Sequence, residues 1–367
     1  MQISKIAIAE CCVSLPKILR LGPVEISTRD YVVVRIETED GVRGEAIGYP
    51  RGTPLLETLS NMAHRILDDN SDMRRRLMVN LEQTNVPARA ALTRGLSLID
   101  IALWDIACKR ARQPLFQFIG GLRTTAEVTV VAGYYVDQRS IADVVDEVGQ
   151  LADSGYRRVK IMLKGDDPTF DRNYASVVAS VMPGGLAADA HWSWSTFTEA
   201  RRACRELDEI GLSFIEDPFA ASDIRLTHEL RRDLVTPIAA GEDIFGPRVV
   251  SDLIGGIDIL RVDATTIGGI TSAVEAINIA AAAGRTVFPH VFSPIHVHLA
   301  CAFPNVESVE LITEESGADP LHLLLRNVPT AKDGTMSPSQ EPGVGISVDW
   351  DAVEKLSRRH AVVEPEN

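Results

Sequence analysis

Residues 157–310 contain three short apolar runs that each end in an acidic residue: GLAAD (185–189), LSFIE (212–216) and PIAAGE (237–242). The acids Asp189, Glu216 and Glu242 follow one another at intervals of 27 and 26 residues. Apolar runs at this spacing, with helical patterns between them, are typical of the βα units of a parallel barrel. Because the strands of such a barrel end at one common mouth, the three carboxylates are expected to converge there.

Converging carboxylates repel one another unless a cation lies among them, and oxygen ligands suit Mg²⁺. Asp189, Glu216 and Glu242 are therefore predicted to be metal ligands. Any one of these acids alone would more often be a solvated loop residue. Their shared position at the ends of successive strands argues against that interpretation.

The composition limits the classes of partner. A chain of 367 residues suits a barrel plus a second domain, and a net charge of −14 argues against nucleic acid or an anionic membrane as a partner. The sequence contains no run of 18 apolar residues, so we do not expect a membrane-spanning helix. The five cysteines are scattered without metal-ligand spacing, and the N-terminal residues do not resemble a signal peptide, so we expect a cytoplasmic protein.

The first 122 residues are predicted to form an α+β unit outside the barrel. Alternating segments predict strands at 2–10, 31–38 and 42–48, and the last two are joined by Asp40-Gly41, a hairpin signal. The segments 14–28 and 48–53 are interpreted as loops, because they contain Gly and Pro. Helices are predicted at 55–68, 74–84 and 88–112.

Residues 123–325 are predicted to form the barrel, and the tail, 326–367, is expected to return to the N-terminal unit. The predicted strands are 127–134, 157–163, 185–189, 212–216, 237–241, 257–262, 285–289 and 306–310. The predicted helices are 140–154, 168–182, 196–210, 222–234, 247–254, 268–284 and 294–302, with one further helix in the tail at 350–359.

Other strand ends carry basic and acidic candidates. Alternation along the second strand places Lys160 on the interior face of the barrel near the metal, unless the face is reversed and Lys160 points outward. The sixth and seventh strands end in Asp263 and His290, which adjacent strand ends would bring together. An Asp bonded to one imidazole nitrogen fixes the tautomer, so His290 is a candidate base poised near neutral pH. Glu310 ends the eighth strand and has either a catalytic or a structural role.

These residues together suit the removal of a proton next to a carboxylate. The metal and Lys160 would neutralise the dianion that forms, and His290 would take the proton. The motifs that carry a family resemblance are IDIALWDI (99–106), PL (114–115), GG (120–121), GYRRVK (155–160), IEDP (215–218), GE (241–242), GG (268–269), HLA (298–300) and PN (304–305), together with Asp189, Asp263, His290 and Glu310.

On these motifs the sequence resembles the enolase superfamily, mandelate racemase subgroup, over nearly its whole length. The resemblance implies an α/β fold, a modified (β/α)₇β TIM barrel with an α+β capping domain built from both termini. It implies Mg²⁺ on the three acids, a His290–Asp263 pair, and a hydrogen-bond donor role for a protonated Glu310. It also implies that the segments 14–28 and 48–53 close the site, and that the protein is a homo-oligomer, a tetramer or octamer.

Two positions depart from the family pattern. Members that act on two faces of the substrate carry a second lysine where this chain has Met162, which cannot move a proton. The muconate-lactonizing subgroup carries a lysine where this chain has Thr265 or Thr266. One base is enough for dehydration, and some sugar-acid dehydratases of the superfamily place a catalytic histidine where this chain has His191. The alternative for His191 is a hydrogen bond to a metal ligand.

The sequence therefore predicts an enzyme, a Mg²⁺-dependent lyase that dehydrates a small-molecule carboxylate, an aldonic or aldaric sugar acid. The reaction would be α-proton abstraction followed by β-elimination of water. The first alternative is a racemase or epimerase that uses Lys164 or Lys160 as its second base. The second is a catalytically silent family member that binds an acidic ligand or serves as a scaffold.

Overall fold

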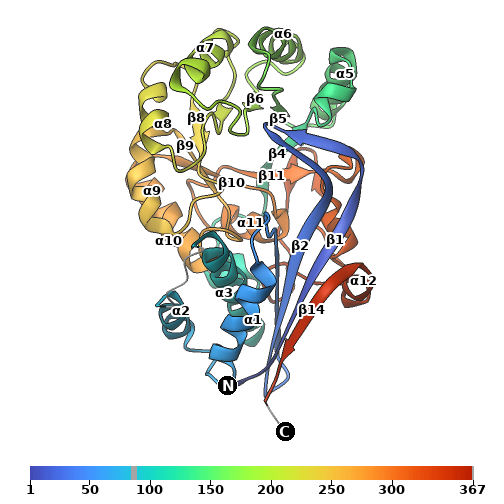
Figure 1. Cartoon of the computed structure of the whole chain (residues 1–367), viewed down its shortest axis with the longest axis vertical. Coiled ribbons are helices and arrows are strands. Elements are labelled where there is room, and N and C mark those ends of the chain that lie inside the picture. Colours follow the sequence, from blue (N-terminus) through green and yellow to red (C-terminus); the bar gives the residue numbers. More distant parts are fainter. Residues whose placement is uncertain (84–88, 366–367) are drawn as a thin grey trace.

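The computed structural model describes residues 1–83 and 89–365 and shows, within them, one antiparallel sheet and one largely parallel sheet (Figure 1). The antiparallel sheet has the order β14-β1-β2-β3, with β1 (Ile3–Leu21), β2 (Val24–Thr38), β3 (Arg43–Gly48) and β14 (Ser357–Val363). After β3 come the helices α1 (Leu55–Ile66), α2 (Arg74–Glu82), α3 (Arg89–Ala111) and α4 (Leu115–Phe118). The last residue of the helix predicted at 74–84 and the first residue of the helix predicted at 88–112 lie outside the described residues.

The segment 14–28 is the tip of a long hairpin, so the prediction of a loop was wrong. Strands β1 and β2 pair along most of their length and are joined by a short turn that begins at Gly22. A Cβ on Gly22 would lie 2.3 Å from the carbonyl oxygen of His191, so the hairpin tip touches the barrel mouth. Leu19 and Leu21 are buried there. This burial holds the segment in an extended conformation despite its Gly and Pro residues.

The parallel sheet closes on itself. In the described part of the chain, seven parallel strands pair in chain order from β4 to β10. An eighth strand, β11, pairs with β4, and a bridge between Val306 and Val287 links the segment before β11 to β10. The strands lie where the sequence predicted them to within a few residues. They are β4 (Ala126–Ala132), β5 (Arg158–Met162), β6 (Leu186–Asp189), β7 (Ile215–Glu216), β8 (Ile238–Ala240), β9 (Ile259–Val262), β10 (Thr286–Pro289) and β11 (Ser308–Ile312).

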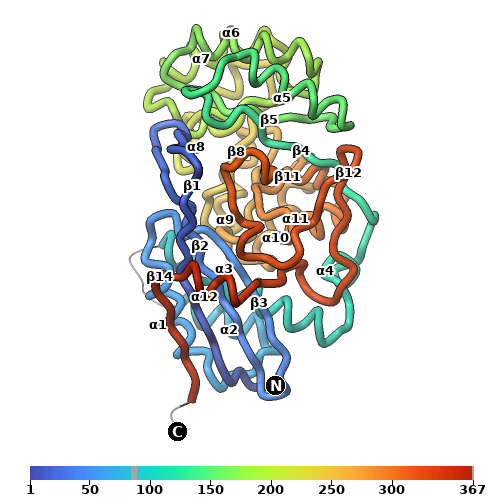
Figure 2. Tube along the Cα trace, turned by 90° about the vertical axis from the view of Figure 1, so that its right-hand side faces the viewer, coloured from blue at the N-terminus to red at the C-terminus, as the bar shows by residue number. Residues whose placement is uncertain are grey.

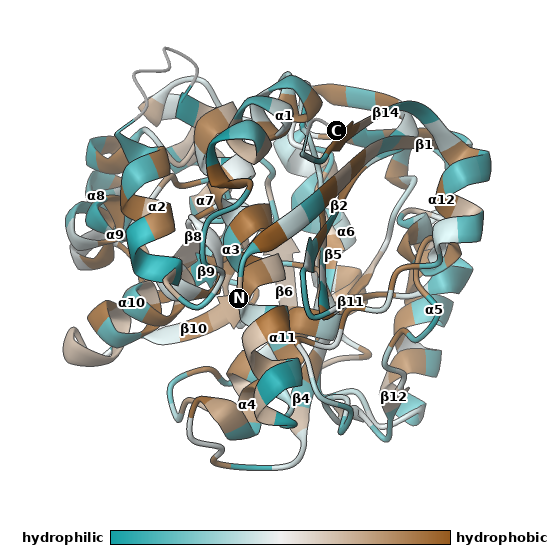
Figure 3. Ribbon diagram, turned by 90° about the horizontal axis from the view of Figure 1, so that it is seen from below, coloured by the Kyte–Doolittle hydropathy of each residue, from teal (hydrophilic) through white to brown (hydrophobic). Residues whose placement is uncertain are grey.

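Helices cover the outside of the barrel. They are α5 (Ile141–Asp153), α6 (Pro168–Ala179), α7 (Phe197–Asp208), α8 (Ile224–Arg231), α9 (Pro247–Leu253), α10 (Gly269–Ala282) and α11 (Ser293–Ala300). Helices α5 and α7 begin at capping boxes, in which Ser140 and Thr196 bond the third residue of the helix. Helix α2 of the N-terminal unit and helix α10 of the barrel both show hydrophilic and hydrophobic residues, as expected when only one face is buried (Figure 3).

The alternation of side chains along the strands places the functional residues. A layer of apolar side chains fills the barrel interior, and the residues two positions further along most of these strands form the layer above it, at the mouth. The lower layer contains Ala187, Phe214, Ala239, Ile259 and Phe288. The layer above it contains Asp189, Glu216, Arg261 and His290. The packed lower layer therefore forms the floor of a polar site.

The C-terminal tail contacts both sheets. Strands β12 (Ala331–Lys332) and β13 (Thr335–Met336) form a small hairpin beside β4. The helix predicted at 350–359 ends earlier, as α12 (Trp350–Leu356), and the chain continues as β14, which pairs with β1 (Figure 2). The last strand of the tail therefore belongs to the antiparallel sheet. The domain boundaries at 122/123 and 325/326 stay predictions.

Helix α3 joins the cap to the barrel through buried acids. Asp100 accepts hydrogen bonds from the backbone N–H and the hydroxyl of Thr271, at 2.9 and 2.7 Å, at the start of α10. Asp105 accepts from the backbone N–H groups of Glu45 and Val344, both at 3.0 Å. These two residues of the 99–106 motif are therefore structural. Within the described residues, no helix is long and apolar enough to cross a membrane.

Candidate active site

Lys160 points into the barrel, so the alternative of an outward side chain is excluded. Its Nζ lies 3.1 Å from Asp189 Oδ2, 3.1 Å from Glu216 Oε2 and 2.9 Å from Glu310 Oε2. Burial alone would lower the pKa of Lys160, but the three carboxylates raise it well above its usual range. Lys160 is therefore a fixed positive charge at the barrel mouth.

Arg261 is a central residue of the site to which the sequence analysis gave no role. The side chain is fully buried. Its Nε donates to Glu216 Oε1 at 2.9 Å, a terminal N–H pairs with Glu310, and another donates to the carbonyl oxygen of Phe288 at 2.9 Å. Side chains two positions apart on a strand point to the same face, so the alternation that places Asp263 inside the barrel also places Arg261 there. This alternation could have identified Arg261 from the sequence.

Glu310 lies between two cations, with Lys160 Nζ at 2.9 Å and a terminal N–H of Arg261 paired with it. Burial would raise its pKa, but Arg261 and Lys160 outweigh burial and lower the pKa of Glu310. These contacts favour the ionised form, and the protonated donor role that the family resemblance implies stays a prediction.

His290 and Asp263 meet across neighbouring strands, as predicted. His290 Nδ1 lies 3.0 Å from Asp263 Oδ2, and Asp263 Oδ1 accepts from the N–H and hydroxyl of Thr265 at 2.7 and 2.8 Å. This arrangement places the proton on Nδ1, and Nε2, the other ring nitrogen, lies 3.2 Å from Glu242 Oε2 at the edge of the acidic region. Burial, followed by Arg51 and Arg261, lowers the pKa of His290 well below its usual range, rather than leaving it near neutrality as expected.

The predicted metal-binding acids form a connected acidic region. Carboxylate oxygens of Glu216, Asp217 and Glu242 lie within 4.8 Å of one another, and Asp189 joins them through Lys160. Asp217 was not foreseen. One buried oxygen of Glu242 and one of Asp217 have no hydrogen-bond partner among the described residues. Burial raises the pKa of Glu242 and Asp217 well above the usual range, and neighbouring carboxylates add to this. An all-oxygen donor set with unsatisfied buried atoms fits a divalent cation.

His191 lies beside this acidic region. Its backbone N–H, rather than its ring, donates to Asp189 Oδ1 at 2.9 Å. The ring stacks on Trp192 with the centroids 4.3 Å apart, and both residues have positive φ values, 45° and 59°. Burial, followed by Arg51 and Lys160, lowers the pKa of His191 to about 3, so the imidazole is neutral. Strained backbone of this kind is common next to functional groups.

Neither of the two residues that decide whether a second base is present has both the chemistry and the contacts of one. Met162 packs in an apolar cluster with Leu19 and Leu21 of the hairpin. Lys164 is partly exposed, and its Nζ lies 3.6 Å from Asp166 Oδ1. In this structure, neither of them offers a base opposite His290.

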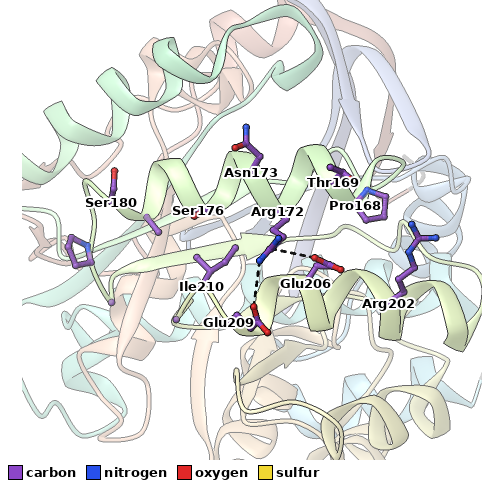
Figure 4. Close-up of a pocket in the computed structure, with 14 residues that line it drawn as sticks. Pro168, Thr169, Arg172, Asn173, Ser176, Ser180, Arg202, Glu206, Glu209 and Ile210 are labelled. Carbon is purple, nitrogen blue, oxygen red and sulfur yellow. Dashed lines mark ion pairs between the residues drawn. The ribbon is translucent and has the colours of Figure 1, made fainter.

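A cavity of about 650 Å³ lies at the barrel mouth and is lined by the hairpin tip, by Tyr49 and Arg51, and by His191. A larger groove of about 1040 Å³ lies between α6 and α7 on the outer surface (Figure 4). Its Arg172 is paired with Glu206 and Glu209, and among the described residues its lining has no contact with the acidic region. The lining of the cavity at the barrel mouth includes Arg51, which comes within 3.7 Å of Glu242, and His191, whose backbone N–H donates to Asp189, so this cavity adjoins the acidic region and is the candidate substrate site.

The fold and site define an enolase-superfamily barrel, a parallel barrel whose strand ends carry acids, a lysine and an imidazole under an antiparallel cap. Residues 8–120 match "Mandelate racemase / muconate lactonizing enzyme, N-terminal domain" and residues 143–352 match "Enolase C-terminal domain-like". The chain belongs to the mandelate racemase/muconate lactonizing enzyme family.

Named relatives are similar over most of the chain. L-talarate/galactarate dehydratase of Salmonella typhimurium is 26% identical over 330 residues, which are 88% of this chain and 81% of that protein. Arabinonate dehydratase of Saccharolobus solfataricus is 25% identical over 301 residues, 78% of this chain and 79% of that protein. The crystal structure of L-talarate dehydratase from Polaromonas sp. JS666, complexed with Mg and L-glucarate, has a TM-score of 0.89, 24% identity and 100% coverage of both chains. At this identity it shows the fold.

Proposed function

We propose that this chain is a Mg²⁺-dependent hydro-lyase that dehydrates a sugar acid, aldonic or aldaric, to a 2-keto-3-deoxy acid. The observation that carries the proposal is the His290–Asp263 pair, 3.0 Å apart, beside buried carboxylates and Lys160. Met162, where two-face members of the family carry a second lysine, has no titratable group and packs in an apolar cluster. The dehydratase names of two relatives support the reaction class.

Asp189, Glu216 and Glu242 would hold the metal, and Asp217 adds a fourth carboxylate beside them. The unpartnered oxygens of Glu242 and Asp217 support this assignment. The similar structure from Polaromonas was solved with Mg, which supports the choice of ion. Bound Mg²⁺ would supply positive charge to the substrate carboxylate while the α-carbon loses its proton.

The side chains of this protein would move the protons. Nε2 of His290 takes the α-proton, and Asp263 holds the imidazole in position through Nδ1 and stabilises the imidazolium. Lys160 provides a second positive charge beside the substrate carboxylate. His290 then returns its proton to the departing β-hydroxyl group, which leaves as water. Because His191 is neutral and lines the cavity, we assign it a hydrogen bond to the substrate instead of proton delivery.

The geometry gives less support to a racemase or epimerase, which needs a base on each face of the α-carbon. Lys164 lies towards Asp166, and Lys160 is held protonated by three carboxylates. A catalytically silent binding protein is the remaining alternative, although it has no need of a histidine paired with a buried aspartate.

A library of aldonic and aldaric acids, assayed for 2-keto acid with Mg²⁺ and again with a chelator, tests the proposal. Metal-dependent keto-acid formation from one acid would confirm the reaction class and identify the substrate. If no acid in the library gives product, the dehydratase proposal fails. Incorporation of solvent deuterium into recovered acid without elimination would then indicate epimerisation, and tight binding without exchange would indicate a silent member.

Two expectations about the protein as a whole stay predictions. We propose a homo-oligomer, a tetramer or octamer, which analytical ultracentrifugation would test. We also propose a cytoplasmic location, which fractionation of the source cells would test.

A further inference from the structure

Arg29 is a buried cation that faces the substrate cavity with most of its hydrogen-bonding groups free. It lies on β2, is 8% exposed and lines the cavity at the barrel mouth. Its Nε donates to the carbonyl oxygen of Ala318 at 2.9 Å. Its other N–H groups form no hydrogen bond or ion pair with any described residue. The nearby carboxylate, Asp319, already accepts from the hydroxyls of Tyr31 and Tyr49.

Arg51 is the second cation of this wall. Its guanidinium lies against the ring of Tyr49, 5.6 Å from the centroid, and that of Arg29 lies 5.5 Å from the same centroid. Arg51 comes within 3.7 Å of Glu242, which is too long for a hydrogen bond, and its buried Nε has no partner among the described residues. Two like charges therefore lie against one aromatic ring, and neither guanidinium is hydrogen-bonded to a carboxylate of the described residues.

The third arginine of the cavity differs, because it is already neutralised. Arg94 pairs with Asp243 at 2.5 Å and donates to the carbonyl oxygen of Tyr49 at 3.3 Å. Arg51 shares Glu242 with the proposed metal site, so Arg29 and Arg51 are the cations of this wall that have no hydrogen bond to a carboxylate among the described residues. Burying such a charge is costly unless an anion accompanies it.

We infer that Arg29 and Arg51 form a subsite for a second carboxylate of the substrate, so that the substrate is a dicarboxylic, aldaric acid rather than a monocarboxylic one. This inference rests on the proposed function, which places the reacting carboxylate at Lys160 and the metal ligands. A cavity of about 650 Å³ is large enough for a six-carbon diacid.

The test compares six-carbon aldaric acids with aldonic acids of the same configuration, by titration calorimetry of the whole protein with Mg²⁺. We expect at least one diacid to bind about 10-fold or more tightly than its monoacid partner. Arg29→Met should weaken the diacid about 100-fold and change the monoacid little, because a charged hydrogen-bonded pair is lost. Arg29→Lys should restore part of the diacid affinity, since the charge returns.

Arg20→Met is the matched control, because Arg20 lies on the same hairpin but is exposed and paired with Glu25. It should leave the ratio of diacid to monoacid affinity unchanged. If Arg29→Met does not fold, Arg51→Gln makes the same prediction. Equal binding of diacid and monoacid by the wild type, or equal loss of both in the variants, would overturn the inference.

The outcomes separate this inference from the proposed function. Arg29-dependent binding of a diacid without formation of keto acid would sustain the subsite and contradict the dehydratase proposal. Dehydration of a monoacid with no diacid binding would support the dehydratase proposal and contradict the subsite.

Discussion

Replacement of Arg261 by Met removes the central cation of the site and should strongly destabilise the protein. The guanidinium is fully buried and contacts Glu216, Glu310 and the carbonyl oxygen of Phe288. Removing one partner of a buried ion pair costs about 3–5 kcal/mol, because the remaining charge stays buried without compensation. Glu310 still has Lys160 at 2.9 Å in this variant. We therefore expect the free energy of unfolding to fall by about 3 kcal/mol, near the lower end of this range.

Urea denaturation of Arg261→Met, Glu310→Gln and the double variant measures this directly. Because Glu310→Gln removes one of the two charges left without Arg261, the double variant should recover about 1–2 kcal/mol relative to the sum of the two single losses. Arg123→Met is a suitable control, since Arg123 also bonds several groups but only neutral carbonyl oxygens, those of Ala300, Phe303 and Val306. Arg123→Met should lower the free energy of unfolding by about 1–2 kcal/mol.

The reasoning would be refuted by a loss below about 1 kcal/mol in Arg261→Met, or by strictly additive losses in the double variant. Either result would mean that Glu310 is not held ionised by Arg261, and the donor role implied by the family resemblance would regain support.

Three further predictions concern the base, the wall opposite it and the cap. His290→Ala should abolish turnover and leave Mg²⁺ affinity, measured by calorimetry, within about 3-fold, because His290 is not among the proposed ligands; retained turnover would exclude it as the base. Met162→Lys should lower the melting temperature without raising activity, since it buries a cation in an apolar cluster, and a gain in native activity would show that one base is insufficient. Burial raises the pKa of Asp100 to about 6. The stability linked to Asp100 is therefore complete below the pKa of about 4 in the unfolded chain and is lost as the pH rises through about 6, a change of about 3 kcal/mol. Asp100→Asn should remove this pH dependence from urea unfolding, and an unchanged dependence would contradict it.

Much of the fold and part of the site could be predicted because strand alternation and βα spacing act locally. The period of two residues that buries Phe214 and Phe288 also turns Glu216 and His290 into the barrel mouth. The pairing of Asp263 with His290 followed from the neighbouring positions of their strands.

What could not be predicted depended on contacts between distant segments. The tip of the β1–β2 hairpin is extended because Leu19 and Leu21 pack on the barrel, which no local turn signal reveals. The ionisation of Glu310 depends on Arg261, which lies 49 residues away in the chain. The cluster of Asp217 with Glu242 depends on the backbone at Asp217, whose φ is +43°.

The central claim is that a single imidazole base acts on one face of the substrate, and the stereochemistry at the α-carbon tests it most directly. The acid identified by the library is incubated with the protein and Mg²⁺ in deuterated water, and product and recovered acid are examined by NMR. With a single base, we expect 2-keto-3-deoxy acid and, in the recovered acid, no epimer at the α-carbon. An epimer that accumulates alongside the product would show a second base on the opposite face and would exclude the single-base mechanism.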